Sequence, residues 1–341
     1  MRIASHAPSR SAGLRAWVVC LGCGLALFTV MGLGVNAFTV YQPYLLRVHG
    51  FTNAQGSWIT TVRSLFALLS MLTVDRLCRR LVQLGLTRSD GIVALGGGVT
   101  GDLAGFAAAT LLRGVALVQA PTTLLAQVDS AVGGKTGLDL PEGKNLLGCF
   151  YQPRMVLADT VCLATLPRRQ LACGMAEVIK YGCIADEELL TRLEQQEPDW
   201  PRIIRRCLAC KAALVAQDER DEGPRRLLNF GHTFGHAMEA LGGGRYTPGE
   251  CVAAGMMEML RWQTAHGSDQ TAMLARLGTL LERYDLPRRL DDLPETAWRQ
   301  YLLRDKKRSG GEMTIAVLER PGHGVLWSVT PEELLEETRW M

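Results

Sequence analysis

The chain has no excess of charge of either sign and no cysteine framework, and one long stretch has no charged residue at all. Its 341 residues include 37 basic and 34 acidic side chains, a balance that gives no broad basic face for nucleic acid. The ten cysteines lack framework spacing, which argues against a disulfide scaffold and favours a reducing compartment. The charge-free stretch, Ala16–Val40, is largely apolar and long enough to span a bilayer as one helix.

Two cysteine pairs have the C-x-x-C spacing found in metal and redox sites, Cys20 with Cys23 and Cys207 with Cys210. The first pair lies within the apolar stretch, and the second shares one helical face with Ile203. Buried thiols pack well in apolar cores, so core packing is favoured over metal or redox chemistry for both pairs.

Residues 1–82 differ in texture from the rest of the chain. A second apolar segment, Trp58–Val74, is interrupted by Arg63 and is followed at once by the basic run Asp75–Arg80. Arginines also crowd the start, so the positive-inside rule predicts a membrane hairpin with both ends cytoplasmic. The segment resembles the first two helices of a major facilitator superfamily transporter, although two helices form no transport pathway. The alternatives are a buried apolar helical hairpin and a signal peptide, which the length and the missing cleavage site disfavour.

From Gln83 onward the pattern is typical of an α/β protein. Short apolar runs alternate with glycine turns and helical patterns, which predicts a partial parallel-sheet domain over 83–166. Beyond Pro167 a mainly helical domain is predicted over 167–341, with one late strand pair. The expected strands are Ile92–Leu95, Ala116–Gln119, Met155–Leu157, 313–318 and 324–329, and the expected helices include Gln170–Tyr181, Glu187–Gln195, Ile203–Gln217 and Cys251–Ala265.

The most informative motif is Gly91–Gly105, in which an apolar strand leads into three glycines and then into a helical pattern. Bare glycine amides and the positive end of a helix dipole can hold a pyrophosphate at such a turn. Gly96, Gly98 and Gly101 satisfy G-x-G-x-x-G, which is weak evidence by itself.

Downstream, Lys135 and Lys144 are expected on glycine-flanked turns. A P-loop at 129–136 is rejected because Asp129 stands where the Walker spacing needs glycine. Lysines on such turns are suited to grip phosphate or carboxylate oxygens, and the alternative is a pair of solvated surface lysines.

Two further pairs each share a helical face, Glu177 with Lys180 and His232 with His236. On local evidence an ordinary helical ion pair explains the first. The histidines have a spacing that suits metal binding or proton transfer, or else hydrogen-bonded core positions. The glycine before each histidine implies close approach of backbone or ligand.

Taken in order, the motifs from about Asp90 to Leu326 resemble those of 3-dehydroquinate synthase, a sugar-phosphate cyclase. The matching strings are GGGVTGDLAGF (96–106), RG (113–114), QAPTTLLAQVDSAVGGKTG (119–137), GKNLLGCFYQP (143–153), LPRRQLACGMAEVIKYG (166–182), NFGHTFGHAMEA (229–240) and RDKK (304–307). Inosose and valiolone synthases share the fold and cofactor, but the substrate-pocket motifs favour dehydroquinate synthase.

The resemblance implies a reaction in which NAD transiently oxidises a secondary alcohol of 3-deoxy-D-arabino-heptulosonate 7-phosphate. The ketone acidifies the adjacent C–H, phosphate is eliminated, the hydride returns, and ring opening with aldol closure gives 3-dehydroquinate. A divalent metal, zinc or alternatively cobalt, polarises the oxygen. The resemblance also implies a homodimer as the common assembly. We expect a cytoplasmic catalytic portion, and the apolar pattern of residues 16–74 adds the expectation of a membrane anchor.

The same resemblance assigns roles to individual residues. The residues expected around NAD are Gly97, Gly98, Asp102, Thr122, Thr123 and Thr165. Glu177 and His232 match metal ligands. The expected catalytic residues are His236, Lys180, Lys135, Arg113 and Asp129, and the expected substrate-binding residues are Lys144, Asn145, Lys211, Arg225, Asn229 and Lys306.

Two departures from the family pattern stand out. Pro248 occupies the place of a third metal ligand, a histidine in the family, and its side chain has no donor; Glu250, Cys251 or water are the candidate substitutes. The transporter-like hairpin stands where the family has the first strands of the NAD domain, so an uncovered apolar sheet face is expected. The alternatives to an active lyase are therefore a catalytically impaired, membrane-tethered remnant that binds an anionic ligand or partner, and a gene-fusion product that does not fold.

Overall fold

A computed structural model describes residues 76–140, 143–293, 302 and 312–335 of the chain. It divides into two compact units. The described part of the first unit comprises 76–121 and 134–158, and that of the second comprises 122–133 and the described residues from 159 onward.

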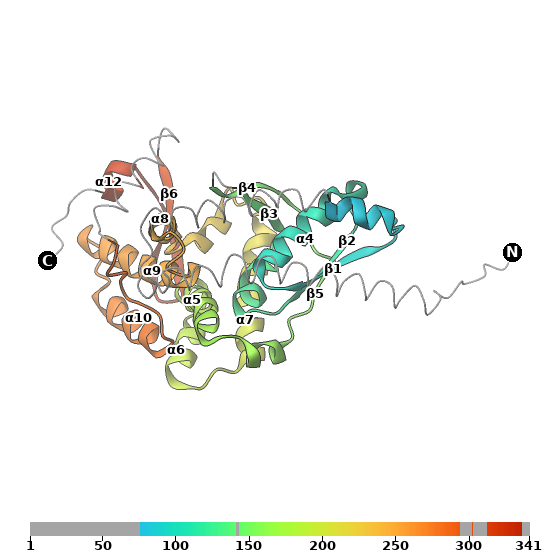
Figure 1. Cartoon of the computed structure of the whole chain (residues 1–341). Helices are drawn as coiled ribbons and strands as arrows, with labels where there is room; N and C mark the ends of the chain where they lie inside the picture. Colours follow the sequence, from blue (N-terminus) through green and yellow to red (C-terminus); the bar gives the residue numbers. More distant parts are fainter. Residues whose placement is uncertain (1–75, 141–142, 294–301, 303–311, 336–341) are drawn as a thin grey trace, which may run out of the picture. The chain divides into compact units, whose positions relative to one another are not determined.

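The first unit is built on a three-stranded sheet in the order β1-β2-β5 (Figure 1). The strands are β1 (Gly91–Gly96), β2 (Ala116–Pro121) and β5 (Met155–Val156), and both pairings are parallel. Helix α4 (Gly98–Thr110) and a 3-10 turn (Leu111–Arg113) connect β1 to β2. The parallel sheet and its three strands confirm the expected α/β class for this part of the chain.

In the described part of the chain, one face of this sheet is packed and the other has exposed apolar side chains. Ala94 and Leu117 are buried in one cluster with Ala104 and Ala108 of α4, and Leu81 of a helix at 76–83 joins them. On the strand positions that alternate with the buried ones, Val93 is 42% exposed and Leu95 58%. Met155 and Leu157 are more than half exposed too. Parallel sheets are normally covered on both faces, and in the described part of the chain these apolar side chains of the second face are exposed.

The first unit also contains a hairpin that the sequence motifs did not indicate. Strands β3 (Lys135–Leu140) and β4 (Gly143–Phe150) pair antiparallel, with Lys135 opposite Phe150. The expectation that Lys135 and Lys144 lie on turns is therefore wrong, because they lie in β3 and β4. Glycines explain the difference: a Cβ on Gly137 would fall 2.7 Å from the carbonyl oxygen of Leu147, so these residues permit close strand approach instead of a turn.

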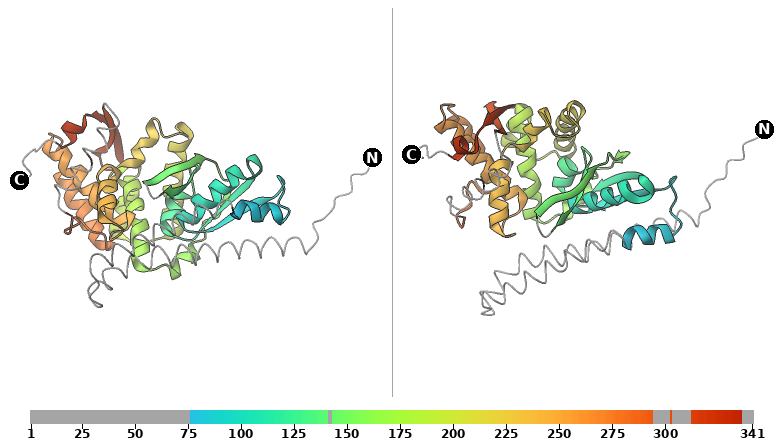
Figure 2. Two further views of the ribbon diagram at one scale, coloured as in Figure 1. Left: turned by 45° about the horizontal axis from the view of Figure 1, so that its top comes forward. Right: turned by 90° about the horizontal axis from the view of Figure 1, so that it is seen from above.

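The second unit is mainly helical, as expected from the sequence. Its helices gather together in both views of Figure 2, in light green to orange. Its elements are a π-helical turn at Ala126–Ser130, 3-10 segments at Thr160–Thr165 and Pro224–Asn229, the helices α5 (Arg168–Ala185), α6 (Glu187–Gln195), α7 (Trp200–Gln217), α8 (His232–Gly242), α9 (Pro248–Ala265), α10 (Thr271–Arg283) and α12 (Pro331–Leu335), and the antiparallel pair β6 (Met313–Arg320) and β7 (His323–Val329). The predicted helices and the late strand pair are confirmed.

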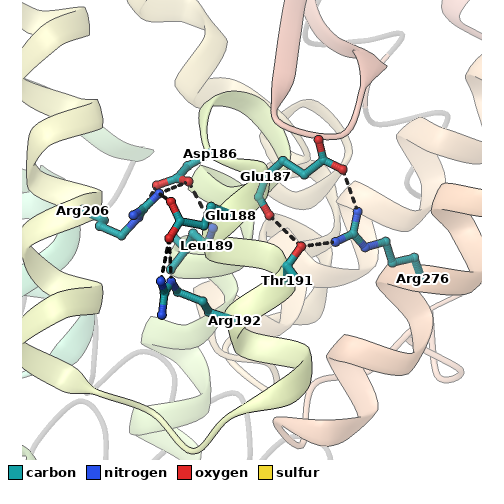
Figure 3. A network of polar contacts seen from close by, with 8 residues as sticks. All are labelled: Asp186, Glu187, Glu188, Leu189, Thr191, Arg192, Arg206 and Arg276. Carbon is teal, nitrogen blue, oxygen red and sulfur yellow. Dashed lines mark hydrogen bonds and ion pairs between the residues drawn. The ribbon is translucent and has the colours of Figure 1, made fainter.

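Helix α5 is deeply buried near the expected site, since every residue from Ala172 to Ile184 is buried. A polar network at its C-terminal end fixes the neighbouring helices (Figure 3). Asp186 caps α6 through the amide of Leu189 and accepts two bonds from Arg206 of α7, at 2.7 and 2.6 Å. Arg276 of α10 contacts Thr191 and Glu187 on the other side of α6. These contacts hold α5, α6, α7 and α10 in a fixed mutual arrangement.

The expected membrane hairpin at 16–74 lies outside the described residues. Within the ranges that the structure does describe, no helix combines the length and apolar character of a membrane span.

Candidate functional site

The glycine turn of the first unit ends β1 and begins α4. Gly97 is the N-cap of α4, and no side chain accepts a hydrogen bond from the first amides of the helix. These amides are donors without an intrahelical acceptor, which is the arrangement that binds phosphate at helix N-termini. A Cβ on Gly96 would come within 2.6 Å of the Thr100 hydroxyl, so the turn requires glycine. The residues here fit the pyrophosphate of a dinucleotide.

In the second unit a carboxylate and an imidazole converge from different helices. Glu177 of α5 and His232 of α8 approach to 3.4 Å between Oε1 and Nε2. The second oxygen, Oε2, forms an ion pair with Lys180 one turn along α5, and both of these side chains are buried. Burial raises the pKa of Glu177, but Lys180 and His232 outweigh burial and bring it down to about 2. The carboxylate is therefore ionised at neutral pH.

Close backbone packing places His232 at the start of α8. Gly231 has a φ of +78°, and a Cβ there would lie 2.9 Å from the carbonyl oxygen of Val252 in α9. A Cβ on Gly235 would lie 2.9 Å from the carbonyl oxygen of Cys251. The glycines before the two histidines thus allow α8 to pack on α9, as their pattern indicated.

Both ring nitrogens of His232 face a specific oxygen atom. Its Nδ1 lies 3.2 Å from the carbonyl oxygen of Phe230. A proton on Nδ1 satisfies that carbonyl and turns Nε2 toward Glu177, which is the orientation of a metal-ligating histidine. His236 is exposed, with its ring centroid 5.3 Å from that of His232 and nearly perpendicular to it.

A second charged cluster adjoins the first. The Lys211 ammonium of α7 donates to the backbone oxygen and to Oδ1 of Asp129, both at 2.7 Å. The Tyr181 hydroxyl of α5 donates to the same Oδ1 at 2.6 Å. Burial raises the pKa of Asp129, but Lys211 and Lys180 hold it well below its usual range. Burial also lowers the pKa of Lys211, against the pull of Asp129.

Tyr181 is the residue that the sequence interpretation missed. Its side chain is fully buried, and its ring centroid lies 5.2 Å from Nζ of Lys180. The available signal was spacing, because Glu177, Lys180 and Tyr181 stand at i, i+3 and i+4 on one helical face.

Other expected residues of the second unit support the backbone around this cluster. Arg225 is buried and donates to the carbonyl oxygens of Gly133, at 2.9 Å, and Glu219, at 2.5 Å. Asn229 ends the 3-10 segment before α8 and is half-buried. The hydroxyl of Thr123 accepts a hydrogen bond from the amide of Ala126, which shapes the turn that carries Asp129.

The remaining expected residues do not belong to the charged cluster of the second unit. Thr122 is half-buried at the start of that unit, and Thr165 is exposed at the end of a 3-10 segment. Lys306 lies outside the described residues. The first unit carries Gly97, Gly98 and Asp102 around the glycine turn, the exposed Arg113 and Lys135, and Lys144 and Asn145 in β4.

Pro248 is the first residue of α9, and its neighbours are engaged. Thr247 and Glu250 form a capping box at this helix end. Both oxygens of Glu250 also accept from Arg169, at 2.8 and 2.7 Å, so this carboxylate is not available as a substitute ligand. Among the described residues no group of three His, Cys, Asp or Glu side chains is placed to hold a metal ion. The donors therefore do not fit the three protein ligands of a usual catalytic zinc site.

Solved structures share this architecture. A 2-deoxy-scyllo-inosose synthase complexed with carbaglucose-6-phosphate, NAD+ and Co2+ is 28% identical, with a TM-score of 0.67 over 79% of this chain and 78% of that one. A 2-epi-5-epi-valiolone synthase from Streptomyces hygroscopicus subsp. jinggangensis, with NAD+ and Zn2+ bound, is 28% identical, with a TM-score of 0.70 over 77% of each chain. The fold is that of the NAD-binding sugar-phosphate cyclases.

The sequence comparisons narrow this class. The family model for the 3-dehydroquinate synthase N-terminal part matches residues 66–173, and the model for its C-terminal part matches 174–308. The 3-dehydroquinate synthase of Symbiobacterium thermophilum is 49% identical over 269 residues, which cover 76% of this chain and 74% of the relative. The chain belongs to the 3-dehydroquinate synthase family.

Proposed function

We propose that the chain converts 3-deoxy-D-arabino-heptulosonate 7-phosphate to 3-dehydroquinate and phosphate, using NAD and a divalent metal ion. The observation that carries this proposal is the charged cluster of Glu177, Lys180, His232, Asp129 and Lys211, in which Glu177, Lys180 and Lys211 are buried, in a chain of this family. The comparisons favour this activity over the alternative of a catalytically impaired remnant.

NAD, when bound, supplies the transient oxidation of the substrate alcohol and its later reversal. In the first unit the bare amides at Gly97 and Gly98 would hold its pyrophosphate, with Asp102 on the same helix. By the family resemblance, Thr122, Thr123 and Thr165 are also proposed as NAD-binding residues. We accordingly assign NAD binding to 83–166 and metal and substrate binding to 167–341.

The cluster in the second unit is suited to an anionic substrate that loses phosphate. Lys180 and Lys211 bring two ammonium groups to one buried region, and Asp129 holds the Lys211 ammonium in place through two bonds. Because burial lowers the pKa of Lys211, its Nζ gives up a proton more readily than that of an exposed lysine. His236, exposed beside the His232 ring, is our candidate for proton transfer to the leaving phosphate.

For the metal ion the described donors are Glu177 and His232. Zinc and cobalt are both proposed occupants, since the two cyclase structures contain one or the other. A homodimer and membrane attachment through 16–74 are further parts of the proposal, and sedimentation of purified chain and fractionation of cells test them.

Phosphate release from the heptulosonate phosphate tests the activity. Purified full-length chain should release phosphate only when NAD and Zn2+ or Co2+ are present, and 3-dehydroquinate should accumulate in equal amount. Glucose 6-phosphate is the matched control substrate, because the inosose synthase structure holds its carba analogue. No release above background with either metal would refute the proposal, and release from glucose 6-phosphate alone would reassign the chain to the inosose synthases.

A further inference from the structure

The donors around Glu177 and His232 fall short of a usual metal site. Related cyclases were solved with Co2+ or Zn2+ bound, yet the described residues of this chain contain no group of three donors for a metal ion. We propose that Glu177 and His232 are the only two ligands that the described residues provide for the divalent ion, that the chain therefore binds the ion weakly, and that Pro248 marks the position where a third ligand completes the site. This inference rests on the proposed function for the presence of the metal.

Backbone contacts place the first turn of α9, which begins at Pro248, beside the two helices that carry Glu177 and His232. The amide of Gly249 donates to Sγ of Cys173 at 3.2 Å, and Cys173 stands one turn before Glu177 on α5. On the other side, a Cβ on Gly235 would lie 2.9 Å from the carbonyl oxygen of Cys251, and Gly235 stands one turn after His232 on α8. The first turn of α9 therefore packs against the two helices that carry the ligands.

Among the described residues no side chain near this turn, Cys251 included, completes a group of three donors with Glu177 and His232. Pro248 presents a hydrocarbon ring. The carboxylate of Glu250 already has partners at both oxygens, in Arg169 and the amide of Thr247. The sulfur of Cys173 in α5 already accepts a hydrogen bond from the amide of Gly249.

Lys180 weakens the site further. Its ammonium is paired with Oε2 of Glu177, and both side chains are about 95% buried or more. A divalent ion that binds Glu177 must compete with that ammonium for the carboxylate, or approach the ammonium in spite of its like charge. Two ligands and a competing cation both act to lower the metal affinity.

Replacement of Pro248 by histidine tests the inference without any turnover. We would titrate the metal-free full-length chain with Co2+ and follow its visible absorption, with calorimetry as the second readout. Pro248→His should bind one Co2+ at least about tenfold more tightly than the wild type, because a third protein ligand is added. Pro201→His is the matched control, since Pro201 is also an exposed proline in the first turn of an 18-residue helix, α7. It should leave the affinity unchanged.

A second variant secures the assignment of the ligands. In the Pro248→His background, Glu177→Gln should abolish the gain in affinity, and Pro248→Asp provides a different donor if the histidine variant does not fold. Wild-type affinity equal to that of both Pro248 variants would overturn the inference, as would a gain that survives Glu177→Gln. Absence of phosphate release with tight Co2+ binding by Pro248→His would count against the proposed function alone.

Discussion

Removal of the Tyr181 hydroxyl tests whether Asp129 is held as a partly buried, ionised carboxylate. In Tyr181→Phe the ring stays and the 2.6 Å bond to Asp129 Oδ1 is lost, while both Lys211 bonds remain. A hydrogen bond to a charged partner contributes about 1.5–3 kcal/mol, so we expect a loss of about 2 kcal/mol in unfolding free energy. For a domain of about 200 residues this corresponds to a fall in Tm of about 4–8 °C.

The control is Tyr284→Phe, which loses a 3.0 Å bond to the uncharged carbonyl oxygen of Leu193 at a partly buried site. It should cost about 0.5–1.5 kcal/mol, as a neutral bond does. In an Asp129→Asn background the Tyr181 bond is neutral as well, so Tyr181→Phe should then cost about 1 kcal/mol less than in the wild type. Urea unfolding at pH 7 of the four proteins in this cycle measures the difference. If Tyr181→Phe cost no more than Tyr284→Phe, and the cycle showed no coupling, Asp129 would not be the charged acceptor that the geometry indicates.

Two further predictions concern pH and backbone packing. The folded-state pKa of Asp129 is lowered, and that of Glu177 is lowered to about 2, so both carboxylates stabilise the fold above about pH 4.5 and this contribution is lost as the pH falls toward 2. Unfolding free energy in metal-free buffer should therefore be lower at pH 3 than at pH 6, and Asp129→Asn should flatten the slope; a chain more stable at pH 3 would contradict this. In Gly231→Ala the backbone has a φ of +78° and the new Cβ would lie 2.5 Å from Cγ of Met256. In Gly243→Ala the φ is +56° and nothing lies within 4 Å, so only left-handed strain of about 1–2 kcal/mol is expected. Gly231→Ala should therefore lower the unfolding free energy by more than Gly243→Ala does. Equal unfolding free energies for these two variants would show that α8 does not pack on α9 as described.

The regular elements of the second unit could be predicted because their local signals agree with their packing. Helix α6 runs over Glu187–Gln195, as its pattern indicated, because Asp186 caps it and its apolar residues recur on one face. Helix α7 contains the predicted Ile203–Gln217 and begins three residues earlier, at Trp200, with Pro201 in its first turn. In such elements one stretch of sequence contains both the start signal and the buried face.

The β3–β4 hairpin could not be predicted in the same way. Its strands contain Gly137 and Gly148, which lower strand propensity and read as turn residues. These two glycines face each other in the paired strands, where they allow the backbones to approach. The property that marks them as turn residues in isolation is the one that the pairing requires, and only the partner strand shows it.

Local sequence patterns likewise account for only part of the candidate site. Spacing places Glu177, Lys180 and Tyr181 on one face of a single helix, but the bond from Tyr181 to Asp129 spans 52 residues of sequence. The approach of His232 to Glu177 likewise joins two helices. The sequence resemblance anticipated that approach, whereas helical periodicity alone describes only one helix at a time.

Burial decides between the ordinary and the functional interpretation of Glu177 and Lys180. An exposed pair at this spacing contributes only about 0.2–0.5 kcal/mol to a helix, and it would need no further explanation. Here the side chains are 5% and 2% exposed, and Asp129 and Lys211 bring two more charges into the same region. Removing such charges from water costs several kcal/mol per ion, and well-packed apolar residues of similar volume are often as stable or more so. Stability alone therefore does not explain four charges at this position. Binding of a substrate with phosphate and carboxylate groups, followed by elimination of the phosphate, does explain them.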